Sequence, residues 1–191
     1  LGRLPNGIGD FVVFQSPTPN QENVSEVLPV EPPVFSHESG FFSSPIQLEI
    51  THPDPLVTML YSLDGSDPKP NNVGGVNYNY KNSYQKDPDD IPGPLLTNTF
   101  ETLVYTEVFE VNDRSTDSNK LANINTTPKN IPVFPNENLK KATIVKARAI
   151  KNGVLSPVIT HTYFISNTNS FDSSLPIISI SLDEDKLFDY N

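Results

Sequence analysis

The longest alternating stretch of the sequence lies at residues 142–165, ATIVKARAIKNGVLSPVITHTYFI. In its first half, threonine, valine and alanine occupy every second position, which is the period of a β-strand with one buried face. Asn152 and Gly153 then separate this run from a second one, and Asn-Gly suits a two-residue turn in which both residues have positive φ. Pro157 interrupts the second run early, as an edge or a bulge permits. The stretch therefore predicts a β-hairpin.

Two shorter runs show the same period. Residues 46–53, IQLEITHP, alternate apolar and polar side chains, and residues 56–63, LVTMLYSL, are predicted to form a second strand. The segment 99–111 is β-branched and aromatic and predicts one or two further strands. The residues expected to face the core are Ile46, Leu48, Ile50, Val57, Met59, Tyr61 and Leu63.

Proline narrows the fold class further. The chain has 19 prolines in 191 residues, and proline removes a backbone donor and breaks helix interiors. Because 36% of the residues are hydrophobic, the composition is too apolar for a disordered chain. Residues 24–35 and 166–174 are predicted to be linkers. We therefore expect an all-β fold, an immunoglobulin-like β-sandwich with proline-rich linkers at both ends.

Charge and residue usage exclude several functions. The formal net charge is −10, which would repel a phosphate backbone and argues against nucleic acid as a partner. No apolar run approaches the ~20 residues that a membrane-spanning helix needs. The absence of cysteine excludes disulfides, thiolate catalysis and zinc-thiolate sites, while it leaves the cellular compartment open. No cofactor is expected.

The stretch 60–68, LYSLDGSDP, raises the question of a metal site because Asp64 and Asp67 bracket a short turn. Calcium favours carboxylate and carbonyl oxygens, but the spacing of an EF-hand loop is absent. The favoured interpretation is a structural turn, with Asp64 and Gly65 turning the chain and Asp67 capping it ahead of proline. The acidic run 87–90 is interpreted in the same way, with a solvated loop preferred over a weak calcium site.

Residues 67–98 are predicted to form a long loop, which in a compact domain is either functional or an insertion. Tyr78, Tyr80 and Tyr84 are weak candidates for ligand contacts there, since aromatic rings can stack on sugar faces. The alternative is that the rings pack the loop back onto the sandwich, and this alternative is preferred.

Catalytic motifs are missing from the sequence. His37, His52 and His161 lie far apart and show no helical zinc spacing. A Gly-x-Ser-x-Gly nucleophile motif is also absent. We therefore expect the fragment itself to be non-catalytic.

Two of these stretches carry a resemblance to a known family. Residues 60–68 and the hairpin in 144–165 are similar to the marks of the chitobiase/β-hexosaminidase C-terminal domain, a small β-sandwich module. The resemblance covers roughly residues 28 to 166. It implies a β-sandwich in which the Asp-Gly-Ser-Asp-Pro turn is a corner, and the long segment after that turn departs from the family pattern.

The two ends of the chain resemble other families. Residues 1–23 resemble the last strand and tail of a bacterial lamin-tail domain, where Gly-Arg-x-Pro-Asn-Gly precedes the strand. Residues 175–191 resemble the opening of the spore coat CotH family, whose members look like atypical secreted kinases. The segment 113–128 resembles the module that precedes that domain. None of the kinase-like family's nucleotide or metal motifs falls within these residues.

The three resemblances together imply part of an exported, multi-domain bacterial protein, secreted or at the cell surface. The expected units are residues 1–27, the end of a lamin-tail-like domain with a linker; 28–166, the sandwich; and 167–191, a linker and the opening strand of a CotH-like domain. The expected function is that of a non-catalytic accessory or spacer module whose partners are its neighbouring domains. A cell-surface glycan or protein is a further candidate partner. The alternative is a carbohydrate-binding module that uses the loop tyrosines.

Overall fold

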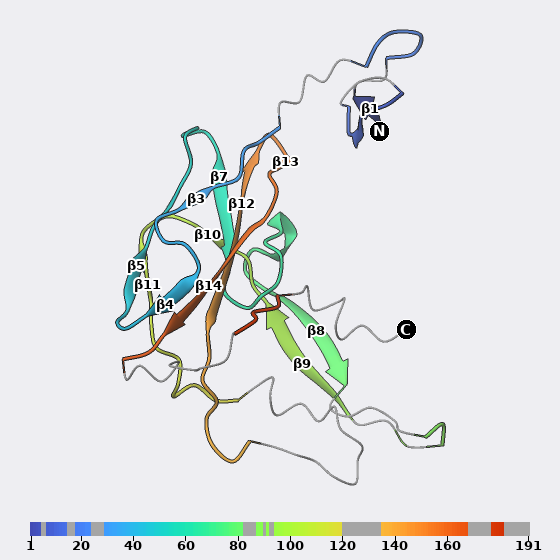
Figure 1. Cartoon of the computed structure of the whole chain (residues 1–191). Helices are drawn as coiled ribbons and strands as arrows, with labels where there is room; N and C mark the ends of the chain where they lie inside the picture. The colour runs from blue at the N-terminus through green and yellow to red at the C-terminus, as the bar shows by residue number, and fades with distance from the viewer. Residues whose placement is uncertain are drawn as a thin grey trace.

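The structure is a computed structural model that describes residues 1–4, 7–14, 18–23, 29–81, 87–89, 91, 94–119, 135–167 and 177–181, with the backbone alone at Tyr80 and Lys81. Its regular elements are strands and one 3₁₀ turn, so the prediction of an all-β fold is confirmed (Figure 1). No helix among these residues has the length and apolar character needed to cross a lipid bilayer.

The main sheet has the strand order β10-β7-β12-β14-β4, with β13 paired beside β12. Its neighbours are antiparallel except for β14 and β4, which run parallel. The strands are β4 (Gly40–Phe42), β7 (Thr58–Ser62), β10 (Leu103–Val104), β12 (Thr143–Lys151), β13 (Val154–Leu155) and β14 (Ile159–Ile165).

A second layer is built from two short antiparallel pairs. β3 (Val34–Phe35) pairs with β6 (Ile50–Thr51), and β5 (Ile46–Leu48) pairs with β11 (Phe109–Val111). Side chains from the two layers form one buried core, so the predicted β-sandwich is present. The core residues are Phe35, Ile46, Leu48, Ile50 and Val111 from the second layer and Val145, Ala147, Tyr163 and Ile165 from the main sheet.

Two hairpins complete the described part of the chain. The first joins β1 (Gly2–Leu4) to β2 (Asp10–Val12) and stands apart from the sandwich (Figure 1). The second joins β8 (Val76–Lys81) to β9 (Leu95–Phe100) and follows a 3₁₀ turn at Pro70–Asn72. The expectation of a long loop over residues 67–98 is therefore wrong for these strands, because β-favouring tyrosine, valine and threonine outweigh the turn residues around them.

The two predicted strands before the corner differ in how well alternation describes them. In 46–51 every apolar residue is buried and every polar one exposed, as expected. In β7 Met59 and Tyr61 pack against the core, but Leu63 is 39% exposed, which corrects its expected core position. Leu60 and Ser62, on the opposite face of β7, are also buried, and the Ser62 hydroxyl donates to the Ser66 carbonyl in the corner.

The first predicted linker range, 24–35, overlaps the sandwich because it contains β3. The second range, 166–174, begins directly after β14, and its described residues are Ser166 and Asn167. Residues 24–28 and 168–176 lie outside the described residues.

The strand after the Asn-Gly turn is interrupted at Ser156 and Pro157. Along β12 two residues lie between Ala147 and Ile150, whereas three lie between their partners Ile159 and Leu155, so the second strand carries one extra residue. Ser156 Oγ accepts the Ala149 N–H at 2.9 Å. At the bulge, a side-chain oxygen thus accepts the hydrogen bond from a backbone N–H of β12. Pro157 is tolerated there because it has no backbone N–H that would need a partner.

Candidate functional site

The corner at 60–68 uses the Asp64 carboxylate inside the fold. One oxygen accepts the Ser66 N–H at 3.0 Å and the Ser66 hydroxyl at 2.6 Å, and the other accepts the Glu101 N–H at 2.8 Å. Gly65 has a φ of 88°, which a residue without Cβ adopts at little cost. Asp64 therefore closes a turn and also ties that turn to the chain that returns at residue 101.

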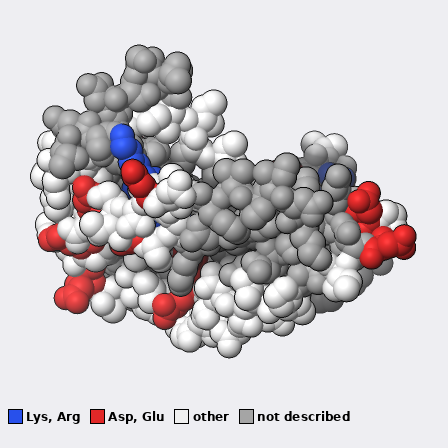
Figure 2. Space-filling view, turned by 90° about the horizontal axis from the view of Figure 1, so that it is seen from below, with Lys and Arg blue, Asp and Glu red and all other residues white. Residues whose placement is uncertain are grey.

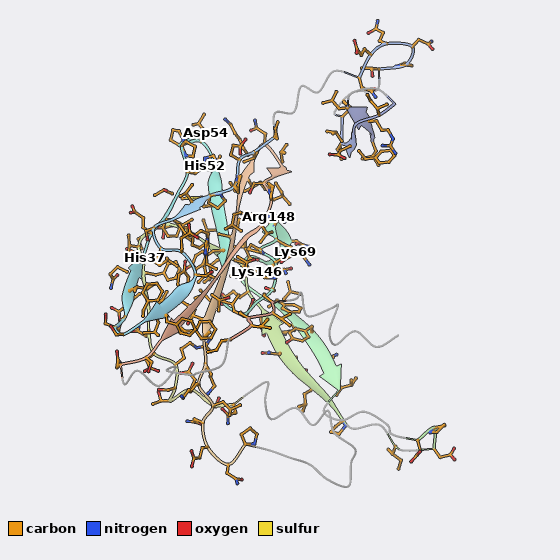
Figure 3. All side chains as sticks on the ribbon, in the orientation of Figure 1. His37, His52, Asp54, Lys69, Lys146 and Arg148 are labelled. Atoms are coloured by element: carbon orange, nitrogen blue, oxygen red, sulfur yellow. The ribbon has the colours of Figure 1, made fainter. Side chains whose placement is uncertain are left out.

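Asp67 pairs with a buried lysine. Its Oδ1 lies 2.8 Å from Lys146 Nζ, and the Lys146 side chain is 5% exposed while that of Asp67 is 33% exposed. Arg148, two residues along β12, donates to the Ser156 carbonyl at 3.1 and 2.9 Å and to the Pro68 carbonyl at 3.4 Å. Figure 3 shows Lys146 and Arg148 close to Lys69. The corner thus covers the outer face of the main sheet through charged hydrogen bonds.

The same corner anchors the β8–β9 hairpin. Thr102, which is 1% exposed, accepts the Lys69 N–H on its hydroxyl at 3.0 Å and donates its own N–H to the Asn72 carbonyl at 3.0 Å. The Asn72 carbonyl also accepts the Gly75 N–H at 3.0 Å. The two ends of the hairpin are therefore fixed to each other and to the 3₁₀ turn.

The described residues contain no group of three or more His, Cys, Asp or Glu that could hold a metal ion. Asp64 already has protein donors on both oxygens and Asp67 has Lys146 on one. Of the acidic run 87–90, Asp87 and Asp89 are exposed and Asp90 lies outside the described residues. Both carboxylates of the corner therefore have hydrogen-bonding partners within the chain.

The second predicted turn is built from Asn152 and Gly153, between β12 and β13. Their φ angles are 50° and 79°, which is the pair of positive values that an Asn-Gly turn favours. Asn152 is one of two non-glycine residues with positive φ among those described, the other being Asn20.

The three candidate tyrosines are not brought together among the described atoms. Tyr78 lies in β8, where its ring stacks on Phe100 with centroids 4.0 Å apart and its hydroxyl accepts a hydrogen bond from Asn98 at 3.0 Å. The side chain of Tyr80 and the whole of Tyr84 lie outside the described residues. Tyr78 is thus part of the packing of the hairpin.

Two of the histidines hold neighbouring chain segments. His52 Nδ1 accepts the Asp54 N–H at 3.0 Å, so the ring proton is on Nε2, which donates to the Glu31 carbonyl at 2.9 Å. His37 Nδ1 lies 2.9 Å from the Ser36 hydroxyl. Figure 3 shows His52 beside Asp54 and well away from His37. No shared site for these two rings follows.

Sequence reasoning missed a cluster of Ser39, His161 and Glu38, which resembles a nucleophile triad by composition. A triad needs the serine on Nε2 of the imidazole and the acid on Nδ1. Here the Ser39 N–H, the Ser39 hydroxyl and Glu38 Oε2 all approach His161 Nδ1, at 3.1, 3.2 and 3.7 Å. Ser39 Oγ also accepts the Thr162 N–H at 3.1 Å. The cluster fastens β4 to β14 and does not activate a hydroxyl.

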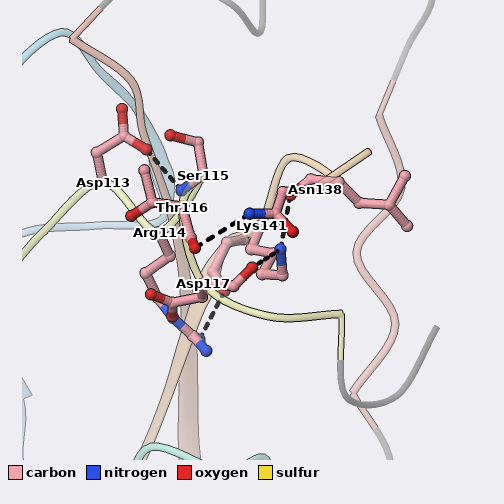
Figure 4. A network of polar contacts seen from close by, with 9 residues as sticks. Asp113, Arg114, Ser115, Thr116, Asp117, Asn138 and Lys141 are labelled. Atoms are coloured by element: carbon pink, nitrogen blue, oxygen red, sulfur yellow. Dashed lines mark hydrogen bonds and ion pairs between the residues drawn. The ribbon is translucent and has the colours of Figure 1, made fainter. Parts of the chain in front are cut away.

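A polar network joins the chain before residue 120 to the chain after residue 134 (Figure 4). Arg114 Nε contacts Asp117 at 2.7 Å, and Lys141 Nζ donates to the Asp117 carbonyl at 2.7 Å. Asn138 donates to the Thr116 carbonyl at 3.1 Å. Asp113 accepts the Ser115 N–H at 2.8 Å and the Asn167 N–H at 3.2 Å. These contacts join the chain that follows β11 to the chain that precedes β12 and to Asn167, which follows β14.

The shifted ionisable groups follow the same pattern. The hydrogen bonds from Lys151 and from the Leu56 N–H lower the pKa of Asp54, and those from Ser115 and Asn167 lower the pKa of Asp113. Burial raises the pKa of Tyr163, whose hydroxyl donates to the His37 carbonyl at 2.8 Å. Figure 2 shows acidic side chains at several separate places on the face viewed. Each of these shifts is caused by hydrogen bonding or by burial.

A hollow of about 490 Å³ lies on the outer face of β4 and β14, beside residues 177–181. In its lining, Thr162 Oγ1 and Ser179 Oγ are 3.0 Å apart, and the Phe41 and Phe164 rings stack with centroids 4.8 Å apart. The Ser181 hydroxyl is buried and has no hydrogen-bond partner within the described part of the chain. The lining residues with hydroxyl groups are Ser39, Thr160, Thr162, Ser179 and Ser181.

No family model, no curated protein and no solved structure matches this chain.

Proposed function

We propose that this chain is a non-catalytic β-sandwich module that sets the spacing and orientation of neighbouring domains in an exported, multi-domain bacterial protein with a CotH-like kinase domain. One observation carries this proposal: the chain is fastened to the sandwich where it enters and where it leaves. At the entry, His52 donates to the Glu31 carbonyl. At the exit, Ser166 donates to the Phe42 carbonyl at 2.9 Å and Asn167 to Asp113 at 3.2 Å.

The strand order supports an immunoglobulin-like arrangement, which we include in the proposal. β3 pairs with β6 in one layer, and β4, a few residues later, pairs parallel to β14 in the other. The chain then passes through β7 and β10 in the main sheet, β11 in the second layer, and β12 and β14 in the main sheet again. The first strands of the sandwich, β3 and β4, thus belong to different layers, and the two layers pack face to face. This arrangement is compatible with an immunoglobulin-like fold.

The mechanism of a spacer is mechanical. Flexible linkers alone leave the distance between two domains broadly distributed, while a folded module fixes it. Because both ends of this sandwich are hydrogen-bonded to its body, its neighbours would leave it in defined directions. The proposed units are those expected from the sequence, at residues 1–27, 28–166 and 167–191.

The test measures the distance distribution between the entry and the exit. The chain has no cysteine, so cysteines introduced at Glu31 and Asn167 can be labelled specifically for single-molecule energy transfer. We expect one narrow distribution, broadened by His52→Ala or Asp113→Ala and unchanged by the control Glu107→Ala. A wild-type distribution as broad as that of the two variants would contradict the spacer function.

A second function, carbohydrate binding, is supported by the hydroxyl-lined hollow beside Phe41 and Phe164. Hydroxyl groups next to aromatic rings are chemistry that suits a neutral sugar. Titration with chitin and cell-wall oligosaccharides, followed by tyrosine fluorescence, tests it. A saturable change that Thr160→Ala removes would place binding at the hollow, and one that Tyr78→Ala removes would place it on the hairpin. No saturable change would exclude both.

A further inference from the structure

The β8–β9 hairpin, called the arm below, projects from the sandwich (Figure 1). Its strands Val76–Lys81 and Leu95–Phe100 pair antiparallel over their whole length. Among the described residues, each strand has a neighbour on one side and none on the other. An isolated two-stranded hairpin is marginally stable in water, and an open edge presents unpaired N–H and C=O groups that can pair with another chain.

Side-chain pairs hold the two strands of the arm in register. On one face Thr99 donates to Asn77 at 2.8 Å and Thr97 donates to Asn79 at 2.9 Å, which forms an Asn-Thr ladder. On the other face the Tyr78 ring stacks on that of Phe100. Cross-strand pairs of this kind stabilise a defined register. The arm is thus ordered by its own contacts up to its outer edges.

The edges lack the usual protection against pairing. Exposed edge strands normally carry charges or proline, but β9 reads LLTNTF and has neither. In the two strands Lys81 is the one charged residue, whereas the whole chain has 13 basic and 23 acidic residues. Leu95 is 63% exposed and Leu96 is 37% exposed. A six-residue, uncharged, β-favouring segment is the signature of a strand that pairs with its own copies.

We propose that the outer edge of β9 is an interface between two copies of this chain, which join antiparallel about a twofold axis into the four-stranded sheet β8–β9–β9–β8. A second copy suits this edge for electrostatic reasons. The net charge of −10 makes most surfaces of two copies repel each other, and β9 is a neutral strip on which they can meet. Asp87 and Asp89 lie between β8 and β9 in the sequence. Antiparallel pairing places these acidic residues of one copy at one end of the joint sheet and those of the other copy at the opposite end. An isologous contact of this kind closes as a dimer and does not propagate.

The test is sedimentation velocity of the full 191-residue chain over a wide range of concentrations at physiological salt. We expect a monomer–dimer equilibrium. Thr97→Lys and Thr97→Glu each place like charges near each other across the axis, and each should weaken association at least ~tenfold. An equimolar mixture of these two variants should recover a heterodimer, because the charges then attract. Thr58→Lys, the same substitution at an exposed strand position of the sandwich, should associate like the wild type.

Several outcomes would overturn the proposal. A wild-type chain that stays monomeric up to millimolar concentration would show that the edge has another partner or none. Association that Thr97→Lys leaves unchanged would place the interface elsewhere. A mixture of the two Thr97 variants that remains monomeric, or an equal loss in Thr58→Lys, would show that net charge and not edge pairing controls association. Far-ultraviolet circular dichroism of each variant establishes that the sandwich is folded.

Discussion

The contact between Asp67 and Lys146 gives the sharpest test of the corner. The Lys146 side chain is 5% exposed, and its Nζ lies 2.8 Å from Asp67 Oδ1. Removing the carboxylate by Asp67→Ala would leave an ammonium group buried without its anion. Removing one partner of a fully buried ion pair typically costs about 3–5 kcal/mol. Because Asp67 is 33% exposed, water can reach the vacated position, and we expect a loss of roughly 2–3 kcal/mol.

The reverse substitution has a different expected result. Lys146→Met removes the buried charge and keeps a side chain of similar length among the same neighbours. Replacing a buried ion by an apolar group is often neutral or stabilising, so we expect a change within about 1 kcal/mol. Asp67→Ala in the Lys146→Met background should then cost less than about 1 kcal/mol. The resulting coupling free energy between the two residues is roughly 2 kcal/mol.

The measurement is urea unfolding followed by far-ultraviolet circular dichroism, with the slope of the transition checked for each variant. Glu107→Ala is the matched control, since it removes the same charge at an exposed position and should stay within about 0.5 kcal/mol. All variants are measured in calcium and in EDTA. A loss on Asp67→Ala that is equal in both lysine backgrounds would refute the buried-pair reasoning. A loss that appears only with calcium would show instead that the carboxylate binds a cation.

Three further outcomes follow from the core and from the shifted pKa values. Leu48→Ala should lower the free energy of unfolding by about 2–5 kcal/mol in urea, since Leu48 is fully buried. Because the pKa of Tyr163 is raised in the folded state, its neutral form contributes stability that is fully present below the unfolded value of 10.0. This contribution is lost as pH rises above 10, so Tyr163→Phe should make the free energy of unfolding depend less on pH in that range. The lowered pKa values of Asp54 and Asp113 mean that their charged forms contribute stability above the unfolded value of 3.8, and this contribution is lost as pH falls. Asp54→Asn and Asp113→Asn should therefore make the free energy of unfolding depend less on pH in the acid range.

Alternation in the sequence predicted the core where one face of a strand meets the other layer. Ile46, Leu48 and Ile50 are at most 8% exposed, and Val145 and Ala147 are fully buried. These strands have one apolar face and one polar face, so period-2 reading suffices. It failed at Leu63, because β7 ends at Ser62 and the next residue is already in the corner. A hydrophobic pattern does not mark the residue at which a strand ends.

The β8–β9 hairpin was harder to predict from sequence. Residues 67–98 contain the turn pair Gly74–Gly75 and several prolines, which are strong loop signals. The strands on either side are specified by contacts between residues about twenty positions apart, such as Thr99 with Asn77 and Asn98 with Tyr78. Local propensity cannot record such pairs. The same limit hid the cluster of Ser39 with His161, since those residues lie 122 positions apart and meet only through the parallel pairing of β4 and β14.

The acidic corner combines these points. The arm leaves the sandwich after the corner and returns to it at Glu101, so the contacts of the corner hold both of its ends. Asp64 accepts hydrogen bonds from Ser66 on the outgoing chain and from Glu101 on the returning chain, and Thr102 closes the same junction. Asp67 attaches the junction to Lys146 in the middle of the main sheet. A carboxylate has two oxygens and can accept hydrogen bonds from two segments at once, which gives the aspartate at this corner a structural role.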